Sequence, residues 1–93
     1  MNIRFVAALA VAGLLAACAM PPEGTTEQDV SNFNEAVASI GCSLRGEGDF
    51  QAVELQTGLS REQVTGMAQY SLESEQSVRQ EDGGLRLTVG ECA

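Results

Sequence analysis

The sequence contains no histidine, no lysine and no tryptophan among its 93 residues. Histidine is the side chain that most often transfers protons near neutral pH, and it is a frequent ligand of metal ions. Without histidine and lysine, catalysis depends on carboxylates, a thiolate, or a hydroxyl group with an unusual partner. We therefore expect a protein that is not an enzyme and that holds no metal ion and no other cofactor.

Positive charge is scarce as well. The chain has five basic residues, all arginines, against 13 acidic residues, and its formal net charge is −8. The acidic residues all lie from Glu23 onward. A surface of this kind repels phosphate backbones and anionic lipid headgroups. The composition therefore argues against direct binding of nucleic acid.

The acidic residues do not follow a metal-binding pattern. Calcium requires six to eight oxygen ligands from a converging loop. Two pairs of carboxylates that could suggest a metal site, Glu73 with Glu75 and Glu81 with Asp82, lack the spacing of an EF-hand loop. We interpret them as parts of a solvated acidic surface.

One long apolar run occurs, at residues 5–15, directly after the positive charge of Arg4. Small residues follow it. A positive start, an apolar stretch of about 11 residues and small residues at the end are typical of a secretory signal peptide. A stretch of this length is too short to span about 30 Å of hydrocarbon as a helix. The sequence therefore predicts a signal peptide over residues 1–17.

The end of this segment, Leu15-Ala16-Ala17-Cys18, resembles the lipobox of bacterial lipoproteins. The resemblance implies that Cys18 receives a diacylglycerol and that type II signal peptidase cuts before it. The new amino group is then often acylated, with a chain such as palmitate. Two or three chains hold a protein at a membrane better than one, since each buried CH₂ contributes about 0.8 kcal/mol. The alternative is an ordinary secretory signal in which Cys18 carries no lipid.

The residue after the cysteine bears on the choice of membrane. In many lipoproteins an aspartate there retains the protein in the inner membrane, whereas this chain has Ala19. The resemblance thus favours the outer membrane of the bacterial cell envelope, with the protein facing the periplasm. Residues 18–25 are expected to form the lipidated cysteine and a tether. Its seven residues after the cysteine reach at most about 25 Å.

Three cysteines are an awkward number in an oxidising compartment. If Cys18 carries lipid, Cys42 and Cys92 remain as candidates for a disulfide. Closing a loop of about 50 residues stabilises a fold by roughly 4 kcal/mol in the chain-entropy model. The alternatives are two buried free thiols or a redox pair, although active dithiols usually lie close together in sequence, as in Cys-x-x-Cys.

Residues 26–93 are expected to form one small domain. The spacing of apolar residues predicts helices over about 27–40, 50–56 and 61–75. Strands are expected over 77–80 and 85–89, joined by an Asp-Gly turn that is typical of a hairpin. The residues expected to face the core from the helices are Val30, Phe33, Val37, Ile40, Phe50, Val53, Leu55, Val64, Met67, Ala68 and Leu72.

Local signals mark the helix ends. Thr26 with Asp29 and Ser60 with Gln63 have the spacing of capping boxes at the first and third helices. Gly41 is placed to end the first helix in a left-handed conformation. Asp49 is expected to cap the second helix.

The expected elements follow the order of a winged helix-turn-helix. That order is a helix, a short extended piece (here residues 42–44), a helix, a turn, a helix and a hairpin. Residues 49–72 resemble its helix-turn-helix part, with Val53 and Met67 at buried positions and Gly58 in the turn. Glu54 departs from the pattern, which favours a small residue. The resemblance implies an α+β fold of three helices followed by a C-terminal β-hairpin. It also implies that the strand after the first helix pairs with the last strand, which would bring Cys42 close to Cys92.

The DNA-reading surface of such a fold has unfavourable charge here. The exposed face of the third helix would enter the major groove, and the hairpin tip would contact phosphate, but that tip is Glu81-Asp82. A scaffold without a DNA-binding role is therefore expected. The helix residues concerned are Arg61, Glu62, Thr65, Gly66, Gln69 and Glu73.

Two functions remain open at this point. The first is a membrane-tethered module that binds an envelope protein with a basic or mixed surface. The alternative is a small thiol redox protein, or an enzyme accessory subunit, that uses Cys42 and Cys92.

Overall fold

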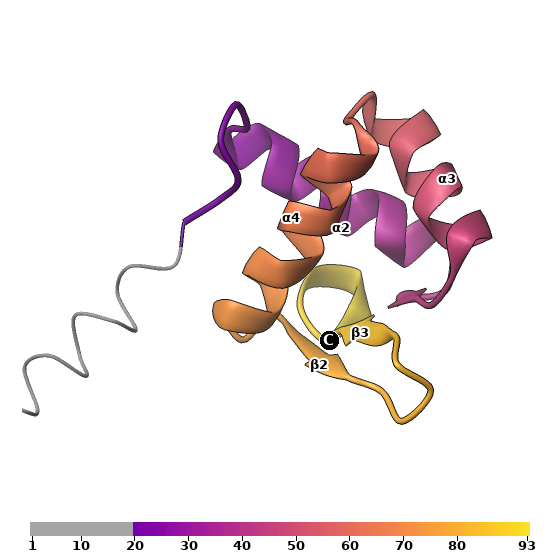
Figure 1. Cartoon of the computed structure of the whole chain (residues 1–93). Coiled ribbons are helices and arrows are strands. Elements are labelled where there is room, and N and C mark those ends of the chain that lie inside the picture. Colours follow the sequence, from indigo (N-terminus) through magenta and orange to yellow (C-terminus); the bar gives the residue numbers. More distant parts are fainter. Residues whose placement is uncertain (1–19) are drawn as a thin grey trace, which may run out of the picture.

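A computed structural model describes residues 20–93 of the chain. The predicted signal peptide and Cys18 lie outside the described residues. The elements are α2 (Glu27–Ser39), β1 (Ser43–Leu44), α3 (Glu47–Thr57), α4 (Arg61–Glu73), β2 (Ser77–Arg79), β3 (Leu85–Leu87) and the 3₁₀ turn η1 (Gly90–Cys92). Figure 1 shows the three helices gathered on one side of the β2–β3 hairpin.

The strands form one antiparallel sheet in the order β1-β3-β2. Ser43 pairs with Arg86 in β3, and Val78 of β2 pairs with the same arginine from the other side. The expected α+β class is therefore confirmed, with a three-stranded sheet in which the strand after the first helix pairs with the last. This arrangement is winged-helix-like.

Two predicted capping boxes are present. The Thr26 side chain accepts a hydrogen bond from the Asp29 amide at the start of α2, and Ser60 does the same with Gln63 at the start of α4. α2 ends at Ser39, and Gly41 just beyond it has the expected left-handed conformation, with a φ of 99°. The Gly41 amide donates to the Ala38 carbonyl, and the next amide, that of Cys42, donates to the Val37 carbonyl. This pair of bonds is a Schellman motif, and it turns the chain from α2 into β1.

The second helix begins three residues earlier than predicted. α3 starts at Glu47, with Gly46 as its N-cap, so the prediction that Asp49 caps this helix is wrong. The Asp49 carboxylate instead reaches back and accepts a hydrogen bond of 2.9 Å from the Arg45 amide. Glu47 and Asp49, the acidic residues in the first turn of α3, favour a helix start there because they lie at the positive end of the helix dipole.

The predicted third helix was too long. α4 ends at Glu73, because Glu75 has a φ of 61° and leaves the helical conformation. The amides of Glu75 and Gln76 donate to the carbonyls of Leu72 and Ser71, which satisfies the end of the helix. This ending turns the chain directly into β2.

The core lies between the three helices and the inner face of the sheet. Phe33 of α2, Met67 of α4 and Leu87 of β3 are its largest fully buried side chains. One polar contact crosses this interior, where the buried hydroxyls of Ser71 and Ser77 lie 2.7 Å apart and join α4 to β2. The buried apolar set is Phe33, Ala36, Val37, Leu44, Val53, Val64, Met67, Ala68, Leu85, Leu87 and Cys92.

Candidate functional site

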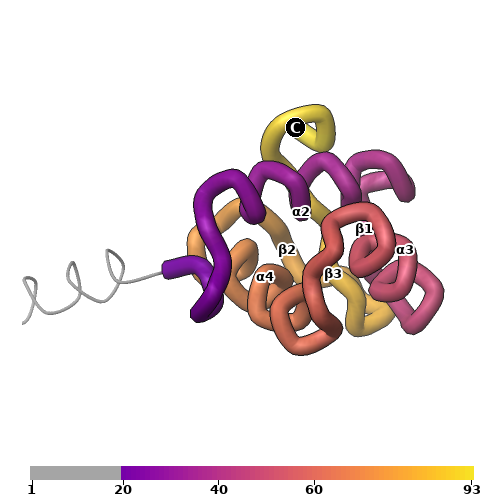
Figure 2. The backbone as a smooth tube through the Cα atoms, turned by 90° about the horizontal axis from the view of Figure 1, so that it is seen from above, coloured from indigo at the N-terminus to yellow at the C-terminus, as the bar shows by residue number. Residues whose placement is uncertain are grey.

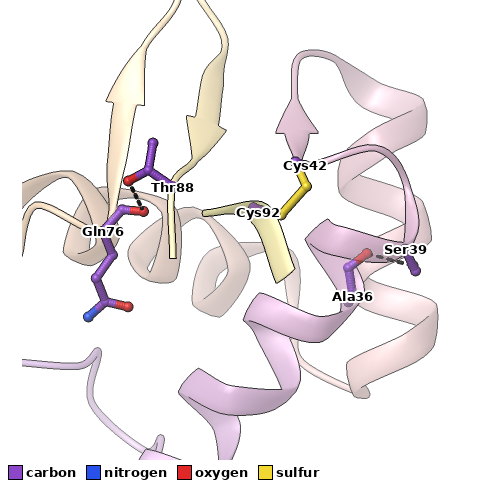
Figure 3. Close-up of a disulfide and its surroundings, with 6 residues drawn as sticks. All are labelled: Ala36, Ser39, Cys42, Gln76, Thr88 and Cys92. Carbon is purple, nitrogen blue, oxygen red and sulfur yellow. Dashed lines mark hydrogen bonds between the residues drawn. A yellow bond between two sulfur atoms is a disulfide. The ribbon is translucent and has the colours of Figure 1, made fainter. Parts of the chain in front are cut away.

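Cys42 and Cys92 form a disulfide, as the sequence predicted, with their Cα atoms 5.7 Å apart. Cys42 follows the end of α2, and Cys92 lies in η1, the last turn of the chain. Figure 3 shows the bond joining these two segments. Figure 2 shows the C-terminal turn lying beside α2. The disulfide therefore fastens the end of the chain to the first helix.

Backbone bonds support the same junction. The Cys42 carbonyl accepts a hydrogen bond of 2.8 Å from the Leu87 amide, so β3 is bonded to the chain beside the disulfide. On the other side of β3, the Gln76 carbonyl accepts bonds from both the amide and the hydroxyl of Thr88. Cys92 is only 6% exposed, and Cys42 is partly buried. Burial of this kind is typical of a structural disulfide and limits access by an attacking thiolate.

The segment before α2 is less extended than the predicted tether. Residues 22–25 form a turn in which the Thr25 amide donates to the Pro22 carbonyl at 3.1 Å, and Gly24 supplies the positive φ of 77°. This turn, called the Pro22 turn below, lies against α4. A Cβ added to Gly66 would come within 2.8 Å of Pro22 Cγ. The glycine inside α4 therefore has a packing role, because its missing side chain makes room for the proline.

Gly66→Ala is expected to displace the Pro22 turn while leaving the domain folded. Alanine favours a helix by about 1 kcal/mol over glycine, but here its methyl group overlaps the proline ring. NOE contacts between Gly24 and the side-chain amide of Gln63, which lie close in the native protein, should disappear. The melting temperature should stay level or rise.

Gly48→Ala is the matched control. Gly48 lies in the first turn of α3, and a Cβ there would meet nothing within 4 Å. It should leave the Gly24–Gln63 contacts in place. If Gly66→Ala also retains them, the contact between the turn and α4 does not depend on the glycine.

Arg61, at the start of α4, is exposed and contacts three residues of α3. Its guanidinium donates to both oxygens of Glu47, at 2.8 and 2.5 Å, and its Nε donates to Glu54. It also lies over the Phe50 ring, 5.2 Å from the ring centre. The hydrogen bonds from Arg61 lower the pKa of Glu47, and the two carboxylates raise the pKa of Arg61. Glu54, which departs from the helix-turn-helix pattern, thus has a partner of opposite charge.

A groove of about 260 Å³ lies between α4 and the β2–β3 hairpin. It is called the hairpin groove below. Apolar side chains from four elements form part of its wall, and two arginines and several polar or glycine residues complete it. The lining residues are Leu44, Arg45, Phe50, Thr65, Ala68, Gln69, Leu72, Arg79, Gly83, Gly84 and Leu85.

Arg45 contacts the hairpin at the rim of this groove. Its Nε lies 3.3 Å from the Asp82 carboxylate. Its stem lies over Gly84, where an added Cβ would come within 3.0 Å of Arg45 Cγ and 2.8 Å of the Leu44 carbonyl. The Asp82 carboxylate also accepts a hydrogen bond from the Gly84 amide. Asp82, expected only as part of a solvated tip, therefore also orders the loop and the arginine.

Sequence reasoning did not find the hairpin groove, because its residues are spread from 44 to 85. The signal that was available is the pair Gly83-Gly84 next to Asp82, which we interpreted only as a turn. The second glycine in fact makes room for the chain around Arg45.

Within residues 20–93, no helix has the length and apolar character needed to cross a membrane. The same part of the chain brings no three of its His, Cys, Asp and Glu residues together where they could hold a metal ion. No family model, curated protein or solved structure matches the chain.

Proposed function

We propose that this protein is a lipoprotein of the bacterial cell envelope that is anchored through Cys18 and acts as a protein-interaction module. The observation that carries the proposal is the lipobox-like sequence Leu15-Ala16-Ala17-Cys18. The disulfide supports it, because Cys42 and Cys92 are bonded to each other and the remaining cysteine is the one at the lipobox. A disulfide also suits an oxidising compartment outside the cytoplasm.

The Pro22 turn supports a close attachment of the domain to the membrane. Because Pro22 packs on Gly66 of α4, only residues 19–21 separate the lipidated cysteine from a residue in contact with the domain. The four Cα–Cα steps from Cys18 to Pro22 reach at most about 14 Å. The Pro22 turn and the face of α4 on which it packs would therefore lie near the lipid.

The same contacts favour an interaction role over a DNA-binding role. Pro22 lies on Gly66, which belongs to the face of α4 that would enter a major groove. Arg61, the one basic residue on that face, is already paired with Glu47 and Glu54. Phosphate contacts supply most of the non-specific affinity for DNA, and this face offers little for them.

Cys18→Ser is expected to abolish lipid attachment. In cells that produce the variant, the chain should keep residues 1–17 or appear in a soluble fraction, whereas the native protein should sediment with membranes. Intact mass spectrometry of the native protein should show acyl chains on residue 18 and a mass two hydrogens lower than that of the reduced form. Met20→Ser, a nearby change outside the lipobox, should be processed and retained normally.

Normal processing and retention of Cys18→Ser would overturn the anchoring part of the proposal. The interaction part is tested separately below, by a binding measurement that does not depend on lipid.

A further inference from the structure

The hairpin groove differs in charge from the rest of the domain. Thirteen acidic residues lie from Glu23 onward, against four arginines. Two of those arginines, Arg45 and Arg79, line the groove, and no acidic residue is among its lining. The groove therefore carries two positive charges on an acidic protein, one of them paired with Asp82 at the hairpin tip.

The two arginines of the groove differ in whether their charge is already paired within the domain. Arg45 is paired with Asp82 and its stem lies over Gly84, as described above. Arg79 is exposed and, within the described residues, forms no ion pair. It pairs across the hairpin with Leu85, and directly opposed residues of an antiparallel pair project to the same face. Arg79 thus lies on the groove side of the sheet with its charge unneutralised.

The rest of the groove is suited to a peptide. Phe50 and Leu72 are partly buried and pack against the core, so each presents part of an apolar surface to the groove. Thr65 and Gln69 supply hydrogen-bonding groups on the α4 side. A volume of about 260 Å³ is below the usual range of small-molecule pockets, which begins at about 300 Å³. It can receive one or two side chains of a segment that continues over the surface.

We infer that the hairpin groove binds an extended segment of a partner protein that presents an apolar side chain next to a carboxylate. The inference rests on the proposed function and names the chemistry of the partner. The apolar side chain contacts Phe50 and Leu72, and the carboxylate accepts hydrogen bonds from Arg79 and Arg45. Bonds between a guanidinium and a carboxylate are charge-assisted and directional, which sets the register of the segment.

Acidic residues around the groove indicate which side chains should flank the central carboxylate of the partner segment. Glu73 lies at the end of α4, and Glu81 and Asp82 lie at the hairpin tip. Lysine or arginine on either side of the central carboxylate would be attracted to these residues. The partner is therefore expected to have a mixed surface, acidic at the centre and basic around it. Duplex DNA carries phosphates without interruption, so these acidic residues repel it.

The test is selection from a displayed library of random octapeptides on the protein purified in detergent, held by a tag after Ala93. Enriched peptides should carry Asp or Glu within two positions of an apolar residue. Their dissociation constants are then measured by fluorescence anisotropy. Arg79→Gln should weaken binding at least tenfold, and the double variant R45Q/R79Q should weaken it further.

Arg86→Gln is the matched control. It removes the same charge from β3, but Arg86 alternates with the buried Leu85 and Leu87 and so faces the opposite side of the sheet. It should change the affinity less than twofold. Circular dichroism should show the same melting temperature for the Arg79 and Arg86 variants, which separates a binding effect from unfolding.

Three outcomes would overturn the inference. They are a library without enriched peptides, enriched peptides that lack acidic residues, and equal weakening by Arg79→Gln and Arg86→Gln. Binding of random-sequence duplex DNA that is lost in R45Q/R79Q would assign the groove to phosphate instead. Since the assay needs no membrane, its failure is distinct from a failure of lipid anchoring.

Discussion

Loss of the Cys42–Cys92 disulfide is expected to remove a large part of the stability of the domain. The bond closes a loop with a sequence separation of 50, and the chain-entropy model assigns about 4 kcal/mol to a loop of that length. A domain of this size has a total stability of about 4–11 kcal/mol at the usual value per residue. The double variant C42A/C92A should therefore populate the unfolded state measurably at 37 °C.

Urea unfolding of the purified protein, followed by circular dichroism, measures this effect. The oxidised protein and the protein with reductant should differ by about 4 kcal/mol in unfolding free energy, and the double variant should match the reduced form. A difference below about 1 kcal/mol would contradict a structural role. The redox alternative is tested on the same samples, since a structural disulfide has a reduction potential below about −300 mV and a reactive pair a higher one.

Replacing Phe33 with alanine is expected to lower the free energy of unfolding by a similar amount. Phe33 is 1% exposed and is among the largest side chains of the core, where α2 packs on α4 and the sheet. Replacing a buried phenylalanine with alanine usually costs 3–5 kcal/mol, because transfer free energy is lost and a cavity remains. Phe33→Ala should thus lower the midpoint of urea unfolding steeply, and in the absence of the disulfide it should prevent folding.

Leu55→Ala is the comparison variant. Leu55 is 85% exposed on α3, so removing its side chain should change the unfolding free energy by no more than about 0.5 kcal/mol. The pair also tests the structure itself, because the sequence alone predicted both side chains to face the core. Similar losses from the two substitutions would mean that α3 is rotated from its described orientation.

Leu55 shows where sequence reasoning failed in the fold. α3 buries only Val53 completely, and a residue two positions away on a helix points about 200° away from it. Glu47 and Gly48 were expected in a loop because two glycines flank the start of the helix, but the acidic first turn and the Asp49 bond to Arg45 extend it. In a short helix with few apolar residues, neighbouring elements decide which side is buried.

The candidate sites also include one feature that the sequence predicted and two that it did not. The disulfide followed from the number of cysteines and from the strand order that the winged-helix resemblance implied, and it is present. The Pro22 turn could not be predicted, because nothing near Pro22 in the sequence indicates that a glycine 44 positions later leaves room for it. The hairpin groove likewise combines residues from β1, α3, α4 and the hairpin.

The sequence by itself determined the order of helices and strands, both capping boxes, the end of α2 at Gly41 and the partners of the disulfide. These features depend on neighbours within a few residues or on a count of cysteines, so they can be read along the chain. Only the tertiary structure decided that Leu55 is exposed, that Pro22 lies on α4 and that Arg45 and Arg79 share a groove. Each of these depends on contacts between segments that are distant in sequence, and the packing of the three helices on the sheet creates those contacts.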